Sequence, residues 1–456
     1  MKKLIETLQN IWKIKELRQR ILFTLGLIFV YRYGSFVVIP GVIPEALETA
    51  TQNQNTLFGL INMFTGGAFN NAAIFALGIM PYITASIIIQ LLGFAVPYFQ
   101  RLQTKEGESG RKKLNQITRI LTLFITLVQG GGYLTYLITT PNVVTSEIPI
   151  GIFWVTNMIL LSTGTIFAMW LGERITDRGI GNGISLLIMI GIIAGLPISL
   201  VGEFQARFSE GQLFRFVLIM SFFYIITMAT IAIVQAVRKI PIQFAKRMIG
   251  RGNYQMPVAG ARDYIPVKVN AAGVMPIIFA QAIMFLPVTV VQYLAGDQAI
   301  ASSPFLQSLM DPFSLSSSIL AFILVVLFTY VYTALVVDPK QYAEYLKRQN
   351  AFIPGIKPGK ATAEYIDAIV SKVTLPGSIF LGIITIMPAI ANKVLGATPA
   401  FSTFFGGTSL IILVGVILDT LQQIETYLLM KKYDGLVKSG RIMGRTRGVH
   451  GIGAPI

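Results

Sequence analysis

Long runs of apolar residues, separated by short polar segments, dominate the chain. Ten runs are long enough to cross about 30 Å of hydrocarbon as α-helices that rise about 1.5 Å per residue. The predicted spans are residues 21–39, 72–96, 117–138, 149–172, 179–201, 213–237, 271–295, 316–337, 373–391 and 404–430. Barrel strands of about ten alternating residues do not fit this pattern. The prediction is therefore an all-α polytopic membrane protein.

A repeated sequence motif suggests how the spans are organised. The sequence GIMPYITASII at 78–88 is matched by GVMPIIFAQAI from Gly273. A proline inside a spanning helix frees a backbone carbonyl and bends the helix. Both copies fall in the second span of a set of five, which predicts a first half, 21–201, and a second half, 213–430, joined by an external hinge loop at 202–212. An odd number of spans per half makes the two halves inverted relative to each other.

The polar ends complete this division. Residues 1–20 precede the first span and 431–456 form a basic tail. Leu4, Leu8, Ile11 and Trp12 share one helical face among lysines, which predicts an amphipathic segment at the membrane surface. No small-residue cleavage site follows the first apolar run, so we expect this segment to stay attached.

Composition narrows the candidate chemistry. Of the 456 residues, 54% are hydrophobic and 13% are charged, there is no cysteine, and the single histidine is His450 in the tail. Disulfides, thiolate metal sites and cysteine nucleophiles are excluded, and a histidine base or metal site nearly so. We expect no cofactor and no enzymatic activity.

The positive charge is placed on alternate loops. All but four of the 37 lysines and arginines fall in the two terminal segments or in the loops after spans two, four, six and eight; the others are Arg32, Arg207, Arg215 and Lys393. This asymmetry fits the positive-inside rule for ten spans with both termini cytoplasmic.

Two basic loops, 238–270 and 338–373, are larger than orientation requires. The second is predicted as helix, turn and helix, broken at IPGIKPGK, with Thr362 as the cap of a helix that places Ile366 and Val370 on one face. Each loop is either a solvated positive-inside connection or a docking platform for an acidic or RNA-bearing partner, and composition leaves both readings open.

Several functions are disfavoured by the spans themselves. Arg32 is the main ionisable residue within a predicted span, and it can also snorkel from near the span's end. No intramembrane nucleophile and base, and no pair of aspartates, suits a protease. GIGNGIS at 179–185 follows no predicted strand, so we do not expect it to be a phosphate-binding loop. A protein channel, a secondary transporter with inverted five-helix repeats and a structural scaffold remain.

Five stretches together resemble the SecY family of protein-translocation channels in its bacterial form, in the right order and over about residues 10 to 447. They are FALGIMPYITASIIIQLL (75–92), ERITDRGIGNGIS (173–185), PVKVNAAGVMPIIFA (266–280), FIPGIKPGKATAEYID (352–367) and GGTSLIIL (406–413). The resemblance implies an hourglass pore in the bacterial plasma membrane. Such a channel passes unfolded polypeptides across the membrane and releases apolar segments sideways into lipid.

The resemblance also implies roles for residues. A ring at the waist would consist of Ile79, Ile83, Ile184, Ile188, Ile278 and Ile412. Segment 60–71 would be a plug, including Phe64, Gly66, Gly67 and Asn70. The lateral gate would include Pro81, Thr84, Gln129, Pro276 and Gln281, with its polar members bridging the closed gate.

The partners follow from the same resemblance. Lys246, Arg247, Arg251 and Lys357 would contact the SecA ATPase and the ribosome, and Arg441, Arg445 and Arg447 add charge on that side. Lys357 stands where the family usually has arginine, and a lysine lacks the planar bidentate fork. The other implied partners are SecE and SecG subunits, preproteins with signal peptides, and membrane lipids. Whether the chain forms a homodimer is left undecided by the resemblance.

Overall fold

The computed structural model describes residues 12–51, 62–104, 106–145, 148–245, 247–249, 256–258, 262–281, 283–284, 308, 311 and 313–438. Leu4, Leu8 and Ile11 of the predicted amphipathic segment lie outside these residues, as do Lys246, Arg251, the tail arginines, His450 and most of predicted span seven. Trp12, the one described member of the amphipathic face, is exposed.

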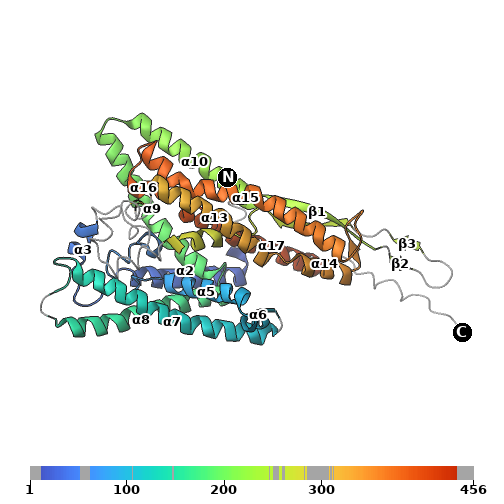
Figure 1. The fold of residues 1–456 in the computed structure, drawn as a ribbon, viewed down its shortest axis with the longest axis horizontal. Helices are drawn as coiled ribbons and strands as arrows, with labels where there is room; N and C mark the ends of the chain where they lie inside the picture. Colours follow the sequence, from blue (N-terminus) through green and yellow to red (C-terminus); the bar gives the residue numbers. More distant parts are fainter. Residues whose placement is uncertain are drawn as a thin grey trace.

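The first half is built from helices that pack in chain order. Its helices are α2 (Lys15–Gly34), α3 (Pro44–Thr51), α5 (Met80–Ala95), α6 (Pro97–Thr104), α7 (Gly107–Thr139), α8 (Ile150–Arg178) and α9 (Gly183–Ser209). Helix α5 packs on α7, α7 on α8, and α8 on α9. Figure 1 shows α7 and α8 running together along the lower edge of the molecule.

The second half packs against α9 of the first half through several of its helices. Its helices are α10 (Leu213–Gln235), α13 (Leu315–Val336), α14 (Pro339–Arg348), α15 (Lys360–Lys393), α16 (Pro399–Ser402) and α17 (Gly407–Lys438). Helix α17 contacts α9 of the first half as well as α10 and α15 of its own half. The interface between α9 and α17 is therefore a seam between the two halves.

Seven described helices are long and apolar enough to cross a membrane, or eight if the bent pair Met80–Gly93 and Pro97–Gln103 counts as one span. Helix α2 is outside this set. It begins with Lys15, Glu16, Arg18 and Arg20, which lower its hydropathy. These helices confirm the prediction of a helical membrane protein with several spans. The number ten stays a prediction, since most of span seven is outside the described residues.

The repeated glycine–proline motif has the same local structure in both halves, and that structure differs from the predicted bend within a helix. Gly78 and Gly273 have φ of 52° and 65°, in the left-handed region that favours glycine. Pro81 lies in the first turn of α5, and Pro276 follows the first helical residue, Met275. The predicted mid-helix bends are wrong. A proline in the first turn loses no intrahelical hydrogen bond, so these prolines begin helices.

The two long basic loops fold together around strands, which the all-α prediction missed. Strand β1 (Val237–Phe244) pairs antiparallel with β4 (Arg262–Lys268) and with β5 (Ala351–Phe352) in the order β4-β1-β5. Strands β2 (Arg247–Ile249) and β3 (Met256–Val258) form a second antiparallel pair. We call β1, β4, β5, α14 and the first turns of α15 the sheet unit; it lies at the right in Figure 1.

The sheet unit has its own hydrophobic core. Ile240 and Val267 of the first loop pack with Leu346, Ile366 and Val370 of the second. The predicted helix, turn and helix of the second loop is present as α14, β5 and α15. The cap prediction was wrong, because α15 begins at Lys360 after Gly359, and the Thr362 hydroxyl donates to the carbonyl of Lys357 at 2.9 Å.

The connection predicted at 202–212 is also shorter than expected. Helix α9 continues to Ser209 and α10 begins at Leu213. In the last turns of α9, Glu203 and Arg207 lie one turn apart and form an ion pair with each other.

Candidate functional site

An apolar cluster between the two halves contains most of the predicted ring. Ile79 comes from the residue before α5, Ile188 from α9 and Ile412 from α17, and all three are buried in the cluster. Ile83 and Ile184, one turn from Ile79 and Ile188, pack against it. Side chains that lie far apart in the sequence thus meet in one hydrophobic cluster. We call it the central cluster.

Ile278 is the exception. It is half-buried and is not among the residues of the central cluster. Val274, four residues earlier and just before the helix begins, does pack against that cluster. Val274 also packs in a second cluster with Ile277, Val325 and Leu381. The segment that carries Ile278 therefore reaches the central cluster one turn before the predicted residue.

The GIGNGIS stretch explains how α9 is aimed at the cluster. Asn182 caps the helix, its Oδ1 accepting from the amides of Ile184 and Ser185 at 3.2 and 3.3 Å. At Gly183 a Cβ would lie 2.0 Å from the carbonyl oxygen of Gly172, so only glycine allows α8 and α9 to approach this closely. Gly183 therefore serves helix packing.

The same loop is held from both halves. Thr24 of α2 accepts a hydrogen bond from the amide of Ile180 at 3.1 Å, and Gln423 of α17 accepts one from the amide of Gly181 at 2.8 Å. Arg20 places its guanidinium 5.2 Å from the ring centroid of Tyr427. Sequence reasoning did not find these contacts, because they join residues at least 156 positions apart.

The predicted plug packs into the central cluster. Phe64 is buried there and Met63 packs against it, while residues 60 and 61 lie outside the described chain. Gly66 and Gly67 have φ of 65° and 93°. The Asn70 amide donates to Oδ1 of Asn62 at 3.0 Å, whereas the buried Oδ1 of Asn70 has no hydrogen-bond partner among the described residues. We call residues 62–71 the inner segment.

The predicted gate residues are spread over three elements. Pro81 and Pro276 are buried, the Thr84 hydroxyl donates to Met80 of its own helix, and Gln281 is half-buried. Gln129 is exposed on α7. Within the described part of the chain no hydrogen bond joins these polar side chains across the helices. The gate therefore stays a prediction.

The predicted docking residues are only partly described. Lys357 is exposed in the turn before α15 and Arg247 begins β2, so both belong to the two folded loops. Lys246 and Arg251 lie outside the described residues. At least one of the predicted docking residues, Lys357, is therefore exposed on a folded part of the basic loops.

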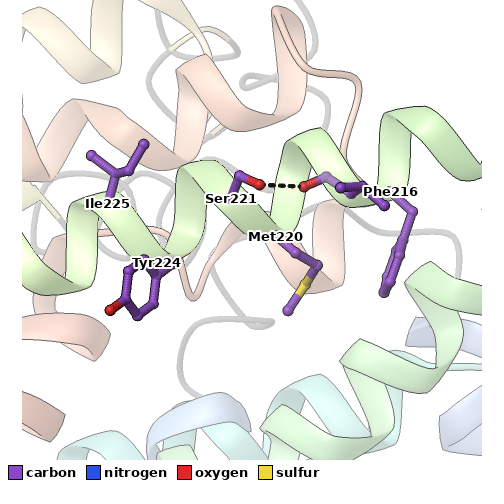
Figure 2. A pocket seen from close by; sticks show the side chains of 6 residues that line it. Phe216, Met220, Ser221, Tyr224 and Ile225 are labelled. Carbon is purple, nitrogen blue, oxygen red and sulfur yellow. Dashed lines mark hydrogen bonds between the residues drawn. The ribbon is translucent and has the colours of Figure 1, made fainter.

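A shallow hollow on α10 is not a second site. It is lined by residues of that one helix, including Met220, Tyr224 and Ile225; Figure 2 shows Tyr224 and Met220 on one side of the helix and Ile225 on the other. The Ser221 hydroxyl donates to the carbonyl of Val217 and offers no free donor. Exposed apolar side chains of this kind are expected on a helix that faces lipid.

Comparison with known proteins decides the family. The model of the SecY family matches residues 73–421. The chain is also similar to protein translocase subunit SecY of Thermus thermophilus, with 42% identity over 446 residues that cover 95% of this chain and 98% of the relative. The chain belongs to the SecY family. This family consists of channel subunits and not of enzymes.

Solved structures share the fold of this SecY-family chain. One, described as showing that the plug domain of the SecY protein stabilises the closed state of the translocation channel, has a TM-score of 0.60 at 19% identity and covers 92% of this chain and 93% of its own. Another, Sec61 in the canine ribosome-channel complex from the endoplasmic reticulum, has a TM-score of 0.55 at 17% identity, with 92% and 94% covered. At these identities the likeness concerns the fold.

Proposed function

We propose that the chain forms the channel through which unfolded secretory polypeptides cross the bacterial plasma membrane, and from which apolar segments pass sideways into lipid. The observation that carries this proposal is the central cluster, where isoleucines of both halves and the inner segment pack together. Membership of the SecY family supports it.

An aliphatic constriction suits such a task. It gates by excluding water and offers no fixed ligand to any substrate side chain, so a passing chain meets a compliant seal. We assign the seal to the six predicted isoleucines, with Val274 added beside Ile278. In the resting state the inner segment fills the space next to this ring as a plug. The hourglass shape and the inversion of the halves belong to the same proposal.

The lateral exit lies between α5 and α7 on one side and the 271–281 segment and α13 on the other. An apolar segment gains roughly 0.3 to 0.6 kcal/mol per Leu or Ile at mid-membrane, so about twenty such residues decide between crossing and staying. Side-chain hydrogen bonds between helices within a membrane average about 0.6 kcal/mol, which is weak enough for the helices of the gate to separate.

The driving force must come from partners. SecA and the ribosome would bind the sheet unit, whose basic residues we place on the cytoplasmic side with both termini. The canine relative is named as part of a ribosome-channel complex, which supports a ribosome contact here. SecE and SecG would complete the channel.

Crosslinking a stalled chain tests the proposal. A secretory polypeptide is arrested in transit, and photo-crosslinking probes replace Ile83 or Ile278. Both probes are expected to label the polypeptide, whereas a probe at the exposed residue Ile159 of α8 is not. Labelling at Ile159 alone would reject the channel assignment. Uptake of a small solute on an ion gradient by purified vesicles, without labelling at Ile83, would favour the secondary transporter.

A further inference from the structure

Arg32 of α2 contacts the backbone of the inner segment. Its Nη1 donates to the carbonyl oxygen of Gly66 at 2.7 Å. The side chain is half-buried, and its guanidinium carbon lies 5.2 Å from the ring centroid of Phe36. No carboxylate pairs with it among the described residues. Arg32 falls within the predicted first span, where a cation is costly, so its use on one carbonyl calls for an explanation.

The packing around this hydrogen bond leaves no spare room. A Cβ at Gly66 would lie 2.5 Å from Nη1 of Arg32 and 2.9 Å from the Cα of Gly191 on α9. A Cβ at Gly191 would in turn lie 2.4 Å from the carbonyl oxygen of Phe64. The backbone of the inner segment thus lies between the Arg32 guanidinium and the backbone of α9.

The polar contacts of the inner segment are unequal between the halves. From the first half, Arg32 bonds Gly66, and the Tyr133 hydroxyl of α7 donates to the carbonyl of Phe69 at 2.7 Å. From the second half, the Ser409 hydroxyl of α17 lies 3.4 Å from the sulfur of Met63. A thioether is a weak acceptor, while a guanidinium makes a charge-assisted hydrogen bond. The attachment to the first half is the stronger one.

We propose that Arg32 is a positioning residue that latches the inner segment to the first half. When the halves separate, the segment stays with α2, α7 and α9 and parts from α17 at Met63. The inference rests on the proposed channel function. The latch holds the inner segment in the central cluster at rest, and without it the segment can leave that cluster while the halves are still together, which opens a leak.

Ion conductance of the full chain in planar bilayers tests the latch. Arg32→Met removes the donor and is expected to raise the resting open probability roughly tenfold or more. Arg32→Lys keeps a cationic donor and is expected to restore part of the closure. A merely structural loss would not be rescued in this way. Unchanged resting conductance in Arg32→Met would overturn the latch.

Two neighbouring glycines provide a matched control. Gly66→Ala and Gly67→Ala both force a side chain into the left-handed region, so both carry backbone strain. Only the methyl group at residue 66 meets Arg32; at 67 the nearest neighbour of a Cβ would be Nδ2 of Asn71 at 3.9 Å. We expect Gly66→Ala to open the channel far more than Gly67→Ala. Equal effects of the two substitutions would contradict the latch.

The direction of parting needs a separate measurement. Because the chain has no cysteine, paired thiols can be introduced without background. A short crosslinker between Met63→Cys and Ser409→Cys is expected to block transit of a secretory chain, while one between Phe69→Cys and Tyr133→Cys is expected to permit it. The reverse result would overturn the proposal.

Failure of the channel function itself looks different. If substituting glycine for Ile83 and Ile188 also produced no ion leak, and if the reduced cysteine pairs passed no secretory chain, the channel assignment would fail and the latch with it. If those variants leak and Arg32→Met does not, only the latch fails.

Discussion

Nε of Arg207 lies 2.9 Å from Oε1 of Glu203, and the two side chains are only 8% and 0% exposed. Arg207 also donates to Oε2 of Glu210 at 2.9 Å and to the carbonyl of Gly396. The second oxygen of Glu203 accepts from the amide of Thr398 at 2.7 Å. The end of α9 in the first half is thereby fastened to the turn between α15 and α16 in the second.

Breaking this ion pair from one side should destabilise the fold strongly. Arg207→Met leaves the Glu203 carboxylate buried without its cation, at a cost on the order of 3 to 5 kcal/mol. Thermal unfolding in detergent measures the loss. Lys112→Met is the control, because its pair with Glu108 is 76% and 88% exposed and contributes little. Adding Glu203→Gln to Arg207→Met should recover part of the stability; a further loss would contradict this account.

Weakening the constriction should produce a leak. With Ile83 and Ile188 both replaced by glycine, water enters the central cluster and small ions follow, so resting conductance in planar bilayers rises. The control replaces Ile152 and Ile159, which are exposed on α8, by glycine. If both double variants conduct alike, the leak reflects general damage to the helices and not loss of a seal.

Gly164 of α8 should tolerate no methyl group. A Cβ there would lie 2.2 Å from the carbonyl oxygen of Ile74, so Gly164→Ala forces the backbone before α5 away and costs about 1 to 3 kcal/mol. Gly151→Ala on the same helix meets nothing within 4 Å and is expected to gain about 0.4 to 1 kcal/mol. Unfolding temperatures of the two variants should therefore move in opposite directions.

The charge and shape of residue 357 should change the affinity for SecA. The exposed ammonium of Lys357 is placed by the turn whose carbonyl accepts from Thr362, so Lys357→Glu should weaken SecA binding by up to roughly fivefold while Lys357→Arg strengthens it. Lys393→Glu, at the other end of α15, is the matched control. Equal weakening by both charge reversals, measured as Kd at fixed ionic strength, would point to net charge alone.

The apolar pattern predicted the helical class well, because a bilayer requires long apolar runs with internally satisfied backbones. Helices α8, α9 and α10 lie close to the predicted spans. The sheet unit was missed because β1 gains its partners from residues such as Lys268 and Phe352, which local patterning does not connect. Pro81 was expected within a span because helix starts inside an apolar run leave little trace in hydropathy.

The candidate site shows the same division. The four-residue spacing of Ile79 and Ile83, and of Ile184 and Ile188, correctly placed each pair near one cluster, with the SecY resemblance choosing among many such pairs. Arg32 was noticed as an unusual charge, but its partner is a backbone carbonyl, which carries no side-chain signature in the sequence. Glu203 and Arg207 carried a signal, an acid and a base four apart, that could have been read as a pair.

Helix α15 joins two features that would otherwise be remote. Its start contributes Ile366 and Val370 to the core of the sheet unit, and its end leads directly into the turn held by Arg207. At 1.5 Å per residue, its 34 residues extend about 50 Å, with Pro376 and Pro388 inside the helix. The core of the sheet unit and the joint between the halves therefore lie at opposite ends of one helix, so a displacement of the sheet unit would be transmitted to that joint along α15.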